Sequence, residues 1–213
     1  MQTQQKLVTT IEHVAFCFDE LLAHFSGASV EPPAFEDTLC PLFVTWNKAS
    51  RRGTTRLRGC IGTLEAKQLH QALKDYALTS ALGDRRFPPI EQSEVPALKC
   101  TVSLLRCFER ASNWLDWTIG QHGLIIEFTD PAAACKWTAT FLPEIAEQEG
   151  WSQQRTIDNL ISKSGYTGAI TPQLRDRLGI VRYESTIASL TFLEYEQLRA
   201  SVVNPEAACA TYA

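Results

Sequence analysis

The stretch PLFVTWNKASRRGTTRLRGCIGT, residues 41–63, carries the strongest fold signal in the chain. Its first residues alternate in the manner of a strand, a polar turn follows around SRRGT, and a second strand returns through Leu57. The pattern predicts a β-hairpin with a long loop. Successive side chains of a strand point to opposite faces, which puts the second strand's residues into two sets: Leu57, Gly59 and Ile61 on one face, and Arg56, Arg58 and Cys60 on the other.

Helices are expected on both sides of this hairpin. Apolar residues recur at helical spacing over residues 9–25, where Thr9 and Glu12 form a capping-box pair. Residues 65–82 show the same spacing, with Thr63 as N-cap. Three later helical segments are predicted at residues 143–149, at residues 152–163 after Ser152, and after Thr171.

The remaining strand candidates are residues 98–108, 124–128, 136–143 and 180–195. Strands and helices mix without regular βαβ alternation, which favours an α+β fold. The segment after about residue 200 is small and polar, and we expect it to be disordered.

Composition narrows the classes of function. The chain has 213 residues, 45% of them hydrophobic and 21% charged, and a net charge of −4, as in a soluble globular protein rather than a nucleic-acid scaffold. A local basic cluster nevertheless occurs between residues 48 and 58. No apolar run approaches the roughly 20 residues that span a bilayer, and the N-terminus lacks the apolar core of a signal peptide.

The seven cysteines are irregularly spaced and include no CxxC pair, so neither a disulfide framework nor a metal site is expected. This usage predicts a reducing compartment, the cytoplasm or the nucleus. Cys17, Cys100 and Cys107 lie in apolar segments and are expected to be buried.

Cys60 is the first candidate for chemistry. A thiol becomes nucleophilic as the thiolate, which a nearby cation or helix N-terminus favours. Arg58 precedes Cys60 by two residues, a helix is expected soon after, and Gly59 and Gly62 would let a substrate approach the backbone. The alternative is an inert, buried thiol between glycines that serve packing.

Two further segments carry candidate site residues. His122 lies between glycines in GQHG and is either a general base or a loop histidine bonded to backbone. In DRRFPP, residues 84–89, Asp84 and Arg86 are expected to pair and pin the loop, with Phe87 buried, or Arg86 binds an anion. Glu94, Glu127 and Glu144 have no partner at catalytic spacing.

Together these blocks resemble the AMMECR family. The resemblance covers roughly residues 8–199 and runs in order through PLFVTW (41–46), LRGCIGT (57–63), LTSALGDRRFPP (78–89), HGLIIEF (122–128), TATFLPEIAEQEGW (138–151) and TIDNLISKSGY (156–166). It implies one α+β domain over residues 8–199, with a mixed, largely antiparallel sheet, flanking helices, two unequal subdomains and a cleft near LRGCIGT. Residues 200–213 would form the disordered tail.

The resemblance implies intracellular residence and, from the family's genomic context, a Memo-type protein as partner. No settled activity and no cofactor come with it. The family block maps onto Arg58, Gly59, Cys60, Gly62 and Thr63.

Two hypotheses follow. In the first, the chain is an enzyme with catalytic Cys60 and His122, and Arg86 holds an anionic substrate such as a nucleotide, an RNA or a protein group. In the second, it is a regulatory interaction domain without covalent chemistry. Under either hypothesis, we expect the site to bind a small anionic ligand.

Overall fold

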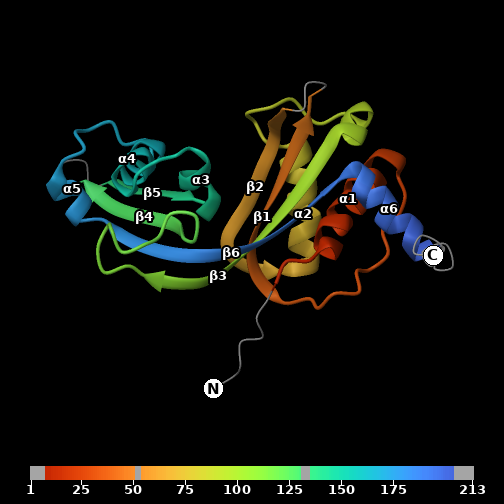
Figure 1. Cartoon of the computed structure of the whole chain (residues 1–213), viewed down its shortest axis with the longest axis horizontal. Helices are drawn as coiled ribbons and strands as arrows, with labels where there is room; N and C mark the ends of the chain where they lie inside the picture. The colour runs from red at the N-terminus through yellow and green to blue at the C-terminus, as the bar shows by residue number, and fades with distance from the viewer. Residues whose placement is uncertain (1–7, 51–53, 131–134, 204–213) are drawn as a thin grey trace, which may run out of the picture. The chain divides into compact units, whose positions relative to one another are not determined.

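In a computed structural model, residues 8–50, 54–130 and 135–203 of the chain are described. The chain divides into two compact units, residues 1–104 with 186–213, and residues 105–185. Six strands form one sheet in the order β2-β1-β3-β6-β4-β5 (Figure 1). The predicted α+β fold, an antiparallel sheet with flanking helices, is therefore confirmed.

The elements follow one another as α1 (Ile11–Ser26), β1 (Leu39–Ala49), β2 (Thr55–Gln68), α2 (Leu69–Leu82), the 3-10 helix η1 (Gln92–Ala97), β3 (Leu98–Arg110), β4 (Gly123–Asp130), β5 (Cys135–Phe141), α3 (Pro143–Gln148), α4 (Gln153–Lys163), α5 (Pro172–Asp176), β6 (Gly179–Thr191) and α6 (Phe192–Val203).

The first unit is organised around the predicted hairpin. Strands β1 and β2 pair antiparallel, and β3 pairs with the other side of β1, so that Val44 lies between Ile61 and Val102. Helix α2 packs against β1 and β2, and α1 packs against α2 (Figure 1). The core of this unit contains Phe18 and Trp46, whose rings meet edge to face, because alternate residues of β1 point toward the helices.

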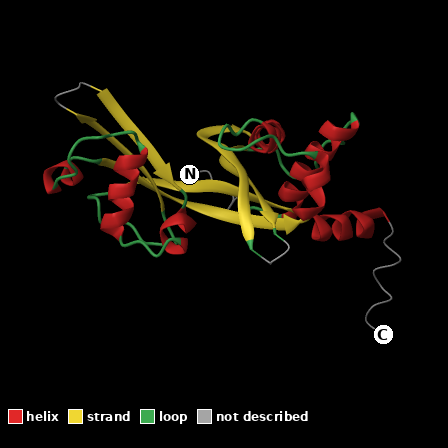
Figure 2. Ribbon diagram, turned by 90° about the horizontal axis from the view of Figure 1, so that it is seen from above, coloured by secondary structure: helices red, strands yellow, loops and turns green. Residues whose placement is uncertain are grey.

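The second unit has its own core. Strand β4 pairs antiparallel with β5 and β6, and α3, α4 and α5 gather on one side of β4 and β5 (Figure 2). The predicted caps are confirmed: the Ser152 hydroxyl accepts the Arg155 N–H at the start of α4, and the Thr171 hydroxyl accepts the Leu174 N–H at α5. These helix starts were predictable because each cap is a hydrogen bond between residues three positions apart in the chain.

Two predicted N-caps are wrong. Helix α1 begins one residue late, with Thr10 as N-cap and His13 in the capping box, because Thr9 instead bonds Thr186 of β6 through its amide and hydroxyl. Helix α2 begins at Leu69 rather than near residue 65. Pairing with β1 keeps the chain extended through Gln68, so Thr63 lies within β2 and is no cap.

The end of the chain also differs from expectation. The expected strand over residues 180–195 ends at Thr191, and α6 follows. Thr191 and Glu194 form the reciprocal bonds of a capping box, so the sequence TFLE did contain the signal. Because α6 continues to Val203, the expected disorder does not begin at residue 200; residues 204–213 lie outside the described residues.

The six described cysteines differ in burial: three are buried, two are exposed, and Cys60 is partly buried. Cys17 and Cys100 are fully buried, as predicted, and burial together with the hydrogen bond between the Cys100 thiol and Cys17 raises the pKa of the Cys100 thiol. Cys107 is exposed, contrary to prediction, and has a left-handed φ of 53°. The buried part of β3 ends at Leu105, a limit that apolar content did not reveal. None of the six described cysteines is in a disulfide.

Within the described ranges, no helix combines the length and the apolar character needed to cross a membrane.

Candidate functional site

Strand β2 is irregular at the centre of the LRGCIGT block. Trp46 lies opposite Gly59, and Asn47 opposite Leu57, so Arg58 is the extra residue of a β-bulge. The expected strict alternation therefore fails at this point. Arg58 and Cys60 make separate sets of contacts, and the prediction that they share one strand face is not supported by this pairing.

The glycines of the block permit close packing. A Cβ on Gly59 would lie 1.8 Å from the Ser80 carbonyl oxygen of α2, and one on Gly62 would lie 2.1 Å from the Leu42 carbonyl oxygen of β1. Real atoms do not approach so closely, so only glycine fits either position. These contacts favour the packing interpretation of both glycines. Thr63, next in the chain, closes a local turn by accepting the Glu65 N–H.

Arg58 is buried, with 6% of its surface exposed, and its charge is met by Glu94. The guanidinium donates to both carboxylate oxygens of Glu94, at 3.1 and 2.7 Å, and to the Pro88 carbonyl at 3.1 Å. Lys48 Nζ donates to the same carboxylate at 2.8 Å. The hydrogen bonds from Arg58, and then those from Lys48 and the Glu91 N–H, lower the pKa of Glu94 to about 2.

Glu94 and Lys48 were missed by sequence reasoning. Glu94 had no partner nearby in the chain because its partner Arg58 is 36 residues away, brought close by η1 and the bulge. The signal that could have found it is charge balance: a buried arginine requires a buried acid.

Cys60 is partly buried and held through its backbone. Its N–H donates to the Asp84 carboxylate at 3.0 Å, and its carbonyl accepts from Arg86 at 3.1 Å. Asp84 and Arg86 in turn form two hydrogen bonds between their side chains, and the Arg86 N–H donates a third, which confirms the predicted pair. The pair bonds the backbone of β2, the edge strand of the sheet, as a neighbouring strand would. The thiol accepts a hydrogen bond from the Thr45 hydroxyl at 3.1 Å.

The charges around Cys60 differ from those expected. The Arg86 hydrogen bond, helped by the Cys60 N–H, holds the pKa of the Asp84 carboxyl well below its ordinary value. Asp84, and to a smaller degree the Cys60 sulfur, raise the pKa of the Arg86 guanidinium. Arg86, with 57% of its side chain exposed, is thus a cation that interacts with Cys60.

The predicted helix N-terminus beside Cys60 is absent. Since α2 begins only at Leu69 and its Ser80 carbonyl meets Gly59, the part of α2 nearest the block is its C-terminal part, where the helix dipole is negative. A negative end disfavours a thiolate. Phe87, expected to be buried, is only half-buried beneath the Arg86 guanidinium, and Ile90 fills the core instead.

A groove borders the block on the side of Arg58. Its volume is about 660 Å³, within the range of ligand pockets. We call it the Arg58 groove; it is lined by Lys48, Arg56, Leu57, Arg58, Phe87, Pro88, Pro89, Glu91, Ser93 and Glu94. Cys60, Asp84 and Arg86 are not among these residues. Arg51 and Arg52, also part of the predicted basic cluster, lie outside the described residues.

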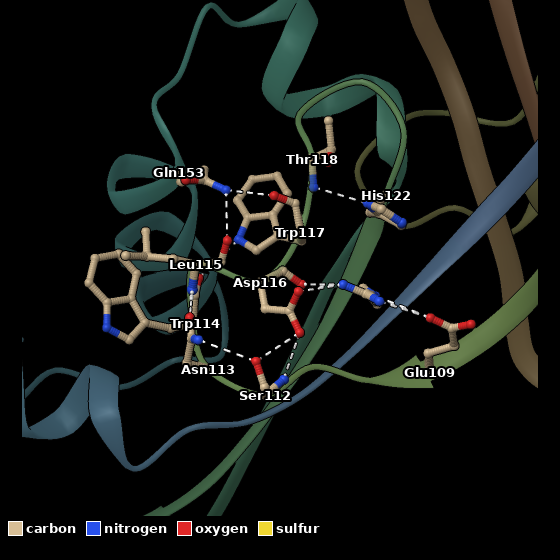
Figure 3. Close-up of polar contacts among 11 residues, drawn as sticks. Glu109, Ser112, Asn113, Trp114, Leu115, Asp116, Trp117, Thr118, His122 and Gln153 are labelled. Carbon is tan, nitrogen blue, oxygen red and sulfur yellow. Dashed lines mark hydrogen bonds and ion pairs between the residues drawn. The ribbon is translucent and has the colours of Figure 1, made fainter.

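His122 belongs to the second unit, unlike the other candidates. Its Nδ1 accepts the Thr118 N–H at 2.9 Å, within a loop that Figure 3 shows braced by several polar contacts. The Asp116 carboxylate accepts from Ser112 and Arg182, and the Gln153 amide donates to the Trp117 carbonyl. Because its acceptor nitrogen is engaged by backbone, the contacts of His122 are those of the predicted loop histidine.

Comparison with known proteins finds relatives over most of the chain. An uncharacterised protein of Arabidopsis thaliana is 52% identical over 184 residues, covering 86% of each chain. An uncharacterised protein of Schizosaccharomyces pombe is 38% identical over 156 residues, covering 73% of this chain and 77% of the other.

A crystal structure of an uncharacterised protein from Pyrococcus horikoshii has the same fold, with a TM-score of 0.68 at 22% identity, and the match covers 85% of this chain and 93% of that one. The AMMECR1 family model matches residues 14–188, most of the chain and all of the elements that build the LRGCIGT region. The chain therefore belongs to the AMMECR1 family.

Proposed function

We propose that this protein is a binding module and that the Arg58 groove binds an anionic ligand. The observation that carries the proposal is the convergence of Lys48 and Arg58 on the single carboxylate of Glu94. Arg56 is a third cation of the lining, which holds two carboxylates, those of Glu91 and Glu94, so the groove has one positive charge in excess. Basic groups beside a concave surface are the usual means of holding phosphates and carboxylates.

Covalent catalysis at Cys60 has less support than binding. Arg58, expected to activate the thiol, is paired with Glu94, and the nearest end of α2 has the wrong sign. The Thr45 hydroxyl donates to the sulfur and the Arg86 guanidinium interacts with it, and both would favour a thiolate, but Arg86 is engaged by the Asp84 carboxylate and the Cys60 carbonyl. The proposal therefore assigns Cys60, Asp84 and Arg86 to holding the edge of β2. A Memo-type partner and residence in the cytoplasm or nucleus remain predictions.

Titration with organic anions tests the groove. We expect benzoate or phenyl phosphate to shift backbone amide resonances of residues 56–58, 87 and 90–94 in an NMR spectrum. Lys48→Gln should weaken the binding of phenyl phosphate about tenfold, the effect of losing an interaction of about 1.4 kcal/mol, and leave the Arg58–Glu94 pair intact.

Lys67→Gln is the matched control, since Lys67 is exposed and pairs with Glu65 elsewhere on β2. Equal weakening by both variants, or no shifts with either anion, would contradict an anion site in the groove.

Alkylation separates binding from cysteine catalysis. With iodoacetamide at pH 7, we expect Cys107 and Cys135 to react first because they are exposed, Cys60 later because it is partly buried, and Cys17 and Cys100 only on unfolding. Peptide mass spectrometry over time gives each rate. If Cys60 reacts faster than Cys107, the thiol is activated and the enzyme hypothesis replaces the binding module.

A further inference from the structure

Lys48 and Arg56 occupy an unfavourable arrangement in the first unit. They are direct partners in the β1–β2 register, and both line the Arg58 groove. Like charges directly opposite each other on paired strands destabilise the sheet. An anion held between the two side chains would remove this repulsion, so the pair is suited to a ligand rather than to stability.

The two side chains retain donors for such an anion. Lys48 Nζ gives one hydrogen bond to Glu94, and an ammonium group has three donors. Arg56 is exposed, and no carboxylate of the described ranges forms a salt bridge with it. Arg58, by contrast, is committed to Glu94 and the carbonyl of Pro88 on the groove floor.

The lining of the groove is also partly apolar. It includes Leu57, the half-buried Phe87, and Pro88 and Pro89, so the groove combines cationic groups with surface that suits an organic group. A volume of about 660 Å³ exceeds what an inorganic anion needs and fits a small organic molecule.

We infer, building on the proposed anion site, that the ligand is a small organophosphate: its phosphate monoester lies between Lys48 and Arg56, and its organic part lies against Phe87 and the prolines. A phosphate monoester has a charge of about −1.5 to −2 at pH 7 and three acceptor oxygens, which match two cations with several donors. A carboxylate has one charge and two oxygens, and so accepts from fewer of the donors that the Lys48 and Arg56 side chains offer.

Phenyl phosphate, benzoate and inorganic phosphate are the probes that test this inference, since the first two share a ring and the first and third share a phosphate. We expect phenyl phosphate to bind at least about tenfold more tightly than either of the others by calorimetry or NMR titration. Lys48→Gln and Arg56→Gln should each weaken phenyl phosphate about tenfold and reduce its advantage over benzoate. Arg110→Gln, which removes an exposed arginine of the second unit, is the control and should change nothing.

The outcomes are distinguishable. If benzoate binds as tightly as phenyl phosphate and Lys48→Gln weakens both, the anion groove stands but the phosphate class is wrong. If inorganic phosphate binds as tightly as phenyl phosphate, the apolar side has no role and the organophosphate inference is wrong. If none of the probes binds to wild-type protein, the proposed function fails as well. We expect Lys48→Gln and Arg56→Gln to fold, because neither side chain is buried, and thermal melting of each variant checks this.

Discussion

Gly59→Ala is expected to destabilise the first unit by about 4 kcal/mol or more, at the extreme end of single substitutions. The added Cβ would lie 1.8 Å from the Ser80 carbonyl oxygen and 2.8 Å from the Ser80 carbonyl carbon. The position of the added Cβ is set by the backbone, and the atoms that it meets are backbone atoms of Ser80, so no side-chain rotation relieves the contact. Helix α2 would have to move away from β2, which would also strain the hydrogen bond from Trp46 Nε1 to the Ala77 carbonyl.

Urea unfolding at equilibrium measures this loss, and Gly179→Ala is the matched control. Gly179 also lies in a strand, β6, but a Cβ there would be 3.4 Å from the Glu127 carbonyl oxygen, an ordinary contact. The control should cost no more than about 1 kcal/mol. A similar, small cost for Gly59→Ala would mean that α2 is not held against β2, and the packing interpretation of this glycine would be wrong.

Glu94→Gln is expected to lower the free energy of unfolding by about 3 kcal/mol at pH 7. The substitution keeps the size of the side chain but removes the only negative charge bonded to both Arg58 and Lys48 among the described residues. Arg58, 6% exposed, would then be a buried charge without a counter-charge. Glu127→Gln, which breaks the exposed Lys136–Glu127 pair, is the control and should cost less than about 1 kcal/mol.

The effect of Glu94 should depend on pH in a defined direction. Its pKa in the folded protein is about 2, lowered from 4.5, so the unfolded state binds a proton more readily than the folded state. The stability that Glu94 contributes is therefore fully present above pH 4.5 and is lost as the pH falls toward 2. In urea unfolding, the difference in free energy of unfolding between wild type and Glu94→Gln should narrow as the pH falls through this range. A difference that stays constant across the range would contradict the proposed ion pair.

The fold follows largely from local patterns in the sequence. Alternation over residues 41–63 gave the hairpin, helical spacing gave most of α1 and α4, and Ser152 and Thr171 gave two helix starts. Such features are predictable because the interacting groups are a few residues apart. The Asp84–Arg86 pair belongs to the same class: two residues separate its members, and the turn brings their charges together.

The candidate site required tertiary structure. The bulge at Arg58 changed which side chains share a face, and strand pairing kept the chain extended to Gln68, which removed the expected helix N-terminus near Cys60. Neither change has a local signal, since each depends on the register between β1 and β2.

The α+β class and the hairpin could be predicted from the sequence alone, because periodicity, caps and turn residues act over short separations. The tertiary structure decided what the block contacts: Glu94 meets Arg58 from 36 positions away, and Lys48 joins them from another strand. A buried charge must find its counter-charge, but the sequence does not say where along the chain that partner lies. Only the packing of η1 against β1, the strand that carries Lys48 and pairs with β2, brings the three groups together beside the groove.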